Sequence, residues 1–190
     1  MGVDNQKFPI ISSVGDSALL IELDIAITPA INARVHELNR WIQKNVLRGV
    51  RECVPGYSSI LVCYDPLVGN IAEIKHWLLS HLGSSSTGTY KSKREIQIPV
   101  DYGGEEGPDL DFVAAFHQIS KQEVVRMHSE KVYRVGMMGF TPGFAYLMGL
   151  DPTLATPRLD TPRTEVPAGS VGIAGVQTGI YPLESPGGWQ

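Results

Sequence analysis

The stretch Val135-Gly-Met-Met-Gly-Phe-Thr-Pro-Gly-Phe-Ala-Tyr-Leu-Met-Gly-Leu150 decides how the second half of this chain folds. It opens a segment, residues 136–190, that holds ten of the 20 glycines and seven of the 13 prolines, with no His, Lys or Cys. Glycine and proline at this density prevent long helices, so we expect short strands joined by sharp turns. The few polar side chains of the segment are therefore the first candidates for a function.

The composition is that of a globular protein. Apolar residues make up 43% of the chain and charged residues 19%, and the net charge is −4. This charge predicts no basic surface for nucleic acid. Neither a signal peptide nor a stretch of about 20 consecutive apolar residues is found. We therefore expect a cytoplasmic protein that binds neither nucleic acid nor membrane.

The first half of the chain begins with a strand and a helix. Ser17–Leu23 is β-prone, and Thr28 followed by Pro29 is typical of a helix start. The apolar residues of this helix keep the 3, 4 spacing of one buried stripe: Ile31, Val35, Leu38, Ile42 and Val46. Gly49 lies where a left-handed helix stop is expected.

A hairpin and a second helix follow. The β-rich runs Val50–Val54 and Ser59–Tyr64 are joined by turn-forming residues, so we expect them to pair antiparallel. Asn70 then predicts the start of an amphipathic helix. Its apolar stripe is formed by Ile71, Ile74, Leu78 and Leu82.

A further strand completes the predicted first domain. Gly83–Lys93 is a polar, flexible loop by composition, and Glu95–Val100 alternates like a strand that Pro99 confines to an edge. The order βαββαβ is the ferredoxin-like pattern, with a four-stranded sheet and two helices on one face. We therefore predict a ferredoxin-like domain over residues 1–104 and a second domain over residues 105–190. This fold supports many functions and indicates none by itself.

The predicted second domain begins with helices and continues with strands. Asp109 is expected to cap a short helix, and Ser120 with Glu123 forms a capping box before another. The first of these helices carries Leu110, Val113 and Phe116. The strand-like pieces that follow are Lys131–Val135, Ser170–Ala174 and Thr178–Tyr181, which favour a small barrel or sandwich packed on helices.

Two arginines are the strongest candidates for binding an anion. Arg158 and Arg163 each follow a proline that fixes the backbone angle φ, so both side chains extend from a stiff loop. Their planar guanidinium groups suit a carboxylate or a phosphate. The alternative is that they pair with Asp160 and Glu165 and only stabilise the loop.

The remaining polar residues give weaker signals. Tyr146, Gln177 and Tyr181 are either hydrogen-bond donors in an apolar pocket or part of a β core. Ser170 matches a relaxed nucleophile elbow, but Pro167 precedes it and β-branched residues follow, so we interpret it as a turn serine. No zinc-ligand spacing and no phosphate-binding glycine loop is recognised, so we predict no metal site.

Five sequence motifs follow one another along residues 139–189. They are Gly139-Phe-Thr-Pro-Gly-Phe-Ala-Tyr-Leu147, Pro157-Arg158 with Pro162-Arg163, Pro167-Ala-Gly-Ser-Val-Gly-Ile173, Gln177-Thr-Gly-Ile-Tyr-Pro182 and Ser185-Pro-Gly-Gly-Trp189. Together they resemble the family of the 5-oxoprolinase B subunit, also called allophanate hydrolase subunit 1, which includes the Kip inhibitor of a sporulation histidine kinase. Gly15–Leu20, Gly56–Pro66 and His128 ahead of Tyr133 extend the resemblance over nearly the whole chain.

The resemblance implies a fold and an activity. Behind the ferredoxin-like domain it implies a cyclophilin-like β-barrel, incomplete here because family members continue with further strands after this point. The implied reaction is the ATP-dependent opening of 5-oxoproline to glutamate, with Mg²⁺, carried out jointly with the paralogous C subunit and the A subunit of the enzyme. A lactam is a poor electrophile, so its phosphorylation calls for cationic groups. The implied site residues are Arg158, Arg163 and His128 for catalysis, and Tyr146, Ser170, Gln177 and Tyr181 for substrate binding.

Two alternative functions share the resemblance. One is a regulatory module that docks on a histidine kinase and performs no chemistry. The absence of a self-contained nucleophile, metal or nucleotide motif fits such a module as well as one member of a shared active site. The other alternative is hydrolysis of allophanate, which usually depends on an amidase domain with Ser-Ser-Lys chemistry that this sequence lacks.

Overall fold

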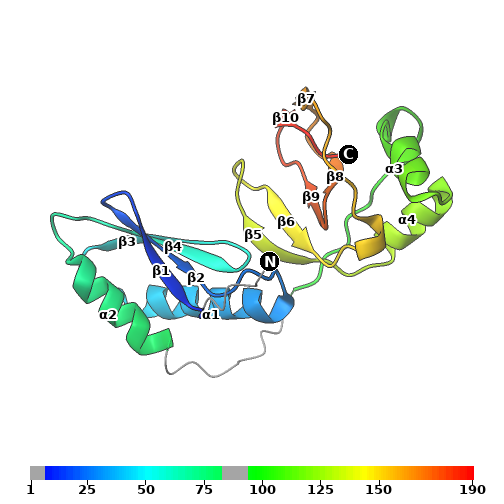
Figure 1. Ribbon diagram of the computed structural model, residues 1–190. Coiled ribbons are helices and arrows are strands. Elements are labelled where there is room, and N and C mark those ends of the chain that lie inside the picture. Colours follow the sequence, from blue (N-terminus) through cyan, green and yellow to red (C-terminus); the bar gives the residue numbers. More distant parts are fainter. Residues whose placement is uncertain (1–6, 83–93) are drawn as a thin grey trace, which may run out of the picture. The chain divides into compact units, whose positions relative to one another are not determined.

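The computed structural model describes residues 7–82 and 94–190. The chain forms two compact units, Met1–Lys93 and Arg94–Gln190 (Figure 1). The predicted loop Gly83–Lys93 lies outside the described residues, and the domain boundary at 104/105 stays a prediction. In the described part of the chain, no helix has both the length and the apolar character needed to cross a membrane.

The first unit is an antiparallel four-stranded sheet with both helices on one side (Figure 1). Its strands are β1 (Ile10–Val14), β2 (Ala18–Glu22), β3 (Val50–Pro55) and β4 (Ser59–Tyr64), in the order β1-β2-β4-β3. Its helices are α1 (Pro29–Lys44) and α2 (Ile71–Leu82). The core joins Leu19, Ile21, Ile60 and Val62 of the sheet to Val35, Leu38, Ile42, Ile74 and Leu78 of the helices. The predicted layers of this unit are confirmed.

The strand at the edge beside β2 is not the predicted one. Ile10–Val14 pairs antiparallel with Ala18–Glu22, whereas Glu95–Val100 forms no strand, so the prediction for that segment is wrong. The two paired strands are joined by a tight turn at Gly15, which has a φ of +60°. Closing so short a loop costs little entropy, and glycine adopts positive φ without strain. The order of elements in this unit is therefore ββαββα.

The start of α1 is as predicted, but its end is earlier. Thr28 Oγ1 accepts a hydrogen bond from the Ile31 N–H at 3.2 Å, as expected of an N-cap. The helix ends before Asn45, whose side chain donates to a carbonyl of the last turn. Val46 is therefore 63% exposed and not part of the buried stripe. Gly49 has the expected positive φ, +93°, but it lies in the turn that leads to β3.

The second unit combines two antiparallel sheets with short helices (Figure 1). The four-stranded sheet has the order β5 (Arg134–Met138), β6 (Ala145–Met148), β9 (Gln177–Ile180), β8 (Val171–Ala174). A two-stranded sheet pairs β7 (Arg163–Val166) with β10 (Ser185–Gly187). The helices are η1 (Gly104–Glu106), α3 (Leu110–His117), α4 (Lys121–Ser129) and η2 (Pro152–Leu154). These elements confirm the predicted α+β class.

The starts of α3 and α4 depart from the predicted caps. Ser120 Oγ accepts from the Glu123 N–H at 3.1 Å, which confirms half of the capping box. The Glu123 carboxylate binds Arg126 instead of returning to the cap. Asp109 forms no side-chain cap bond, and Phe116 is 50% exposed, so it does not belong to the buried side of α3.

The four-stranded sheet separates two groups of buried side chains. The neighbours Thr178 and Gly179 on β9 point to opposite faces, because side chains alternate along a strand. Ile173, which pairs with Thr178, packs with the helices, and we call this side the helical face. Tyr146, which pairs with Gly179, packs on an aromatic cluster, so we call the other side the aromatic face. The aromatic cluster consists of Phe144, Val166, Ala174, Tyr181 and Trp189.

Candidate functional site

Four of the predicted site residues converge on Trp189. The Cζ atom of Arg158 lies 5.9 Å from the Trp189 ring centroid, and the ring of Tyr146 lies 5.7 Å away, centroid to centroid. Arg163 Nη1 donates to the Trp189 carbonyl at 3.3 Å. The Tyr181 hydroxyl accepts from the Trp189 backbone N–H. The tryptophan is therefore fixed through both its peptide groups and its ring.

Two strand glycines allow the aromatic rings to approach the sheet closely. A Cβ atom at Gly179 would lie 2.8 Å from Cζ of Phe144 and 3.0 Å from Cζ3 of Trp189. A Cβ atom at Gly172 would lie 2.9 Å from Cβ of Trp189. These distances are shorter than carbon atoms tolerate, so only glycine permits this packing. As a result Trp189 is 8% exposed.

Backbone hydrogen bonds hold the loop that carries Arg158. Ile173 and Gln190 exchange two bonds, at 2.9 Å and 3.0 Å, so the segment that contains Trp189 lies along the edge of β8. The Leu159 N–H donates to the Gly188 carbonyl at 2.8 Å. These main-chain hydrogen bonds hold the residue after Arg158 against the segment that contains Trp189, and so they set where the Arg158 side chain begins.

The two arginines have different surroundings. Arg163 Nη2 donates to Asp109 Oδ1 at 2.6 Å, and neither Asp160 nor Glu165 is its ion-pair partner. Arg158 is exposed, and within residues 7–82 and 94–190 no ion pair joins it to a carboxylate. Its guanidinium donors are thus available to an incoming anion.

The charge of Arg158 is felt inside the aromatic cluster. Burial raises the pKa of the Tyr181 hydroxyl above its ordinary value, and the positive charge of Arg158 acts in the opposite direction. An electrostatic effect of this kind requires that the two side chains lie near each other. The positive charge of Arg158, which lies over Trp189, thus acts on the hydroxyl of a buried member of the cluster.

Phe140 forms an exposed rim of the same cluster. It lies in the loop between β5 and β6, is 59% exposed and has a φ of +64°. Its ring meets those of Phe144 and Tyr181 edge to face, at centroid distances of 5.5 Å and 6.3 Å. Positive φ is rare for a bulky residue and marks a strained backbone. The Gly139 N–H holds this loop by donating to the Phe144 carbonyl at 3.2 Å.

His128 lies on the helical face, where both ring nitrogens are engaged. Nδ1 is 2.6 Å from the Tyr102 hydroxyl, and Nε2 is 3.0 Å from Thr178 Oγ1. Thr178 Oγ1 donates its single proton to the Gly172 carbonyl at 2.9 Å. Nε2 must therefore carry the proton that it shares with Thr178, and Nδ1 accepts from Tyr102.

The sheet lies between His128 and the ring that Arg158 covers. His128 is 6% exposed, and burial lowers its pKa, so the neutral ring is favoured. Its contact with Thr178 is on the helical face, whereas Arg158 lies over the Trp189 ring of the aromatic cluster. The structure thus groups the predicted site residues into two sets instead of one.

Gln177 and Ser170 complete the predicted set. Gln177 pairs with Ala174, a member of the aromatic cluster, so its side chain is on the aromatic face. Ser170 lies in a turn, where its N–H donates to the Pro167 carbonyl at 3.2 Å. A strand follows Ser170, not a helix, so the interpretation as a turn serine is confirmed.

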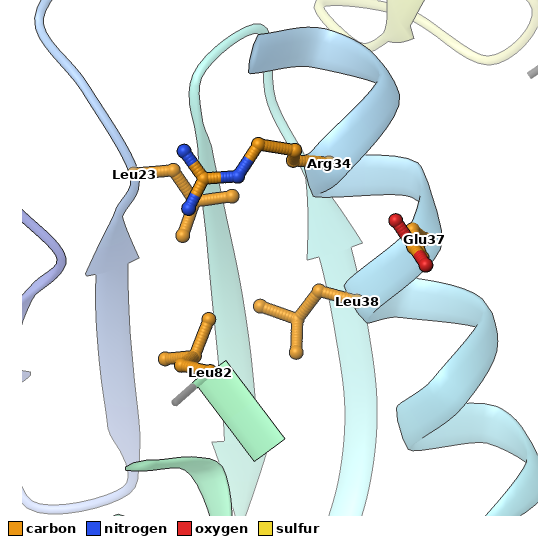
Figure 2. A pocket seen from close by; sticks show the side chains of 5 residues that line it. All are labelled: Leu23, Arg34, Glu37, Leu38 and Leu82. Carbon is orange, nitrogen blue, oxygen red and sulfur yellow. The ribbon is translucent and has the colours of Figure 1, made fainter. Parts of the chain in front are cut away.

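A metal site made by this chain alone is not found among the described residues. Within them no three His, Cys, Asp or Glu side chains gather in a way that could hold a metal ion. A pocket in the first unit, shown in Figure 2, has a volume of about 10 Å³, which is room for about one water molecule. It is lined by Leu23, Arg34, Glu37, Leu38 and Leu82.

Comparison with known sequences gives matches over nearly the whole chain. The family described as "Carboxyltransferase domain, subdomain C and D" matches residues 9–190. The 5-oxoprolinase B subunit of Bacillus subtilis (strain 168) is 39% identical over 190 residues, covering 95% of this chain and 79% of the relative. That of Escherichia coli O157:H7 is 41% identical over 181 residues, covering 93% and 80%.

Comparison with solved structures points to the same fold. The crystal structure of TTHA0988 in space group P212121 superposes with a TM-score of 0.77 at 35% identity, covering 90% of this chain and 34% of that chain. The Kluyveromyces lactis urea carboxylase superposes with a TM-score of 0.72 at 20% identity, covering 100% of this chain and 20% of that chain. The chain thus spans about a third of the length of TTHA0988. We conclude that it belongs to the carboxyltransferase-domain family of subdomains C and D, together with the B subunits of 5-oxoprolinase that it matches.

Proposed function

We propose that this chain is the B subunit of a multi-subunit, ATP-dependent 5-oxoprolinase, which converts 5-oxo-L-proline, ATP and water to L-glutamate, ADP and phosphate. Relatives with that name match more than nine-tenths of the chain at 39% and 41% identity. With a putative urea carboxylase of Emericella nidulans at 27% identity, they support membership of an ATP-dependent amide-hydrolysis system. The name of these relatives implies partners, and we propose the paralogous C subunit and the A subunit of the enzyme.

One observation of the site carries this proposal. Arg158 is an exposed cation, held over Trp189 on a stiff loop, with no carboxylate partner in the described part of the chain. The substrate 5-oxoproline is an anion with an apolar five-membered ring. A guanidinium held over an aromatic cluster that has the exposed Phe140 at its rim suits both features of such a molecule. We assign substrate binding to Arg158 together with the aromatic cluster.

The other predicted residues receive supporting roles in this proposal. Arg163 and Tyr181 hold the backbone of Trp189, so we assign them to positioning. His128 holds β9 through Thr178 and is also assigned to positioning, because its ring nitrogens are both hydrogen-bonded. Gln177 lies on the aromatic face and is proposed to orient the substrate. Tyr146 packs on the aromatic cluster, and Ser170, in the turn before β8, is proposed to contact the substrate.

We further propose that ATP and Mg²⁺ are bound mainly by partner subunits and that this chain is inactive alone. The support is the name of the relatives, which describes them as one subunit of a multi-subunit enzyme. ATP supplies the driving force for opening a stable lactam. The role left to this chain is to bind and orient the cyclic amide next to the partners' residues.

The test is a pair of arginine variants in the assembled complex of full-length subunits. Arg158→Ala is expected to lower kcat/KM for 5-oxoproline-dependent ATP hydrolysis by about tenfold or more, because a charge-assisted contact is lost. Arg126→Ala is the matched control, since Arg126 is a surface residue paired with Glu123 and Glu130 on α4. Wild-type kinetics in the Arg158→Ala complex would contradict the assignment of this site.

A further inference from the structure

We propose that Arg158 and the rim of the aromatic cluster form a carboxylate-binding subsite, which selects cyclic amides that carry a carboxylate beside the lactam nitrogen. The inference rests on the proposed function for the reaction, but it makes a separate claim about which part of the substrate Arg158 binds. The alternative for the same cation is a phosphoryl group.

The first argument is the state of the guanidinium. Arg51, Arg126 and Arg163 each form an ion pair with a carboxylate of this chain. Arg158 instead lies over the Trp189 ring, and such a contact leaves its N–H donors in place. A guanidinium without a carboxylate partner presents two parallel donors, which match the two oxygens of one carboxylate.

The second argument is charge. Residues 136–190 contain no Lys or His, and their only arginines are Arg158 and Arg163. Arg163 is paired with Asp109, so Arg158 is the one arginine of this segment without an ion-pair partner in the described part of the chain. A carboxylate carries a single negative charge, whereas sites for a transferring phosphoryl group gather several cations or metal ions. The charge available here therefore matches a carboxylate better than a phosphoryl group.

The third argument is the apolar surface beside the cation. Phe140 is exposed although its ring contacts the aromatic cluster, and its backbone is held at a φ of +64°. Such strain persists where the surrounding structure enforces it, and it is concentrated at functional positions. The Tyr181 ring meets the Phe140 ring edge to face, and the positive charge of Arg158 acts to lower the pKa of the Tyr181 hydroxyl. The cluster that carries the cation over Trp189 thus also carries exposed apolar surface at Phe140, and we propose that one small molecule uses both.

These three features give the substrate an orientation. With its carboxylate on Arg158, the substrate has its lactam nitrogen next to the bound group, and its lactam carbonyl lies one atom farther along the ring. Loss of the carboxylate from the substrate should then have the same effect as loss of the arginine. The matching pair of molecules is 5-oxoproline and 2-pyrrolidinone, which differ only in the carboxylate.

The kinetic test uses the complex of full-length subunits with both substrates. Arg158→Gln is expected to raise KM for 5-oxoproline about 10- to 100-fold, because one charge-assisted hydrogen-bonded contact is lost. The value of kcat should change little. Arg158→Lys should give a smaller rise, because it keeps the charge and loses the fork. With 2-pyrrolidinone, wild type and Arg158→Gln should not differ. The control variant Arg126→Gln should match wild type with both molecules.

A fall in kcat of equal size with both substrates would overturn the carboxylate assignment and favour the phosphoryl alternative. Unchanged KM for 5-oxoproline in Arg158→Gln would also overturn it.

A binding measurement separates this inference from the proposed function. Calorimetric titration of the same complex with 5-oxoproline, without ATP, should show binding that Arg158→Gln weakens and Arg126→Gln does not. If the wild-type complex binds 5-oxoproline through Arg158 but hydrolyses no ATP, the subsite stands and the proposed function fails. If it hydrolyses ATP while Arg158→Gln binds 5-oxoproline as tightly as wild type, the function stands and the subsite is wrong.

Discussion

Arg163 and Asp109 lie 54 residues apart in the sequence and form an ion pair, with 2.6 Å between Nη2 and Oδ1. The pair joins the residue that precedes α3 to the first residue of β7. Since Arg163 also donates to the Trp189 carbonyl, the contact connects the helical part of the unit to the aromatic cluster.

Removal of either partner of this pair should destabilise the protein. Asp109→Asn and Arg163→Gln are each expected to lower the free energy of unfolding by about 1 kcal/mol, since the pair is partly exposed. The double variant should lose less than the sum, because both substitutions remove the same contact. Chemical denaturation measures these free energies of unfolding. Asp111→Asn is the control, because Asp111 pairs with Lys121 on the exposed surface and its loss should have a small effect. Strict additivity of the two substitutions would show that the pair is energetically silent.

Gly179→Ala should be strongly destabilising. The added methyl group would lie 2.8 Å from the Phe144 ring, and a rigid ring cannot move aside as a flexible side chain can. Overpacking of this kind costs about 1–3 kcal/mol. Thermal unfolding of Gly179→Ala and Gly103→Ala compares the two sites, since a Cβ atom at Gly103 would meet no atom within 4 Å. Equal melting temperatures would show that the rings are not packed against the strand.

Phe140→Gly should be more stable than Phe140→Ala. Both substitutions delete the same ring, but alanine must adopt the φ of +64°, which glycine accepts without strain. The difference in unfolding free energy is expected to be about 1 kcal/mol in favour of glycine. This is the reverse of the usual order of the two residues. Greater stability of the alanine variant would indicate that the loop does not hold a positive φ.

Lowering the pH should reduce the free energy of unfolding through protonation of His128. Burial lowers the pKa of His128 in the folded state below the ordinary value of 6.5, so the unfolded chain binds this proton more readily. The stability from the neutral ring is full above about pH 6.5 and is lost as the pH falls toward the folded pKa. His128→Gln should therefore flatten the dependence of unfolding free energy on pH between about 4 and 7.

The control for this measurement is the exposed His76→Gln variant, which should keep the slope of the wild-type protein. Because burial also lowers the pKa of His81, some slope of the same sign should remain in His128→Gln. The same slope in His128→Gln and wild type would show that His128 titrates alike in both states.

The sequence predicted local structure better than long-range pairing. The caps at Thr28 and Ser120 depend on residues within one helical turn, so their side-chain patterns were sufficient. The edge strand was not predicted, because Ile10–Val14 and Glu95–Val100 have similar β-propensity and only tertiary pairing separates them. A signal was present at Gly15, which allows a tight turn between Ile10–Val14 and Ala18–Glu22. Pairing these two strands closes a much shorter loop than pairing with Glu95–Val100 would.

The candidate site was predicted in its residue types but not in its connections. Both arginines were recognised from their prolines, yet the pairing of Arg163 with Asp109 spans too long a separation for sequence reasoning. Trp189 and Phe140 were missed as site residues. Gly172 and Gly179 were a usable signal for Trp189, since glycine within a strand marks the close approach of another group. Nothing in the sequence indicated the positive φ of Phe140.

The most direct test of the account is 5-oxoproline-dependent ATP hydrolysis by the full-length protein co-purified with the products of its neighbouring genes. Turnover should disappear when only this protein is left out and return when the purified protein is added back. The same assay with ATP but without 5-oxoproline gives the background rate. Turnover that persists at the full rate without this chain would contradict its role as the B subunit of the oxoprolinase.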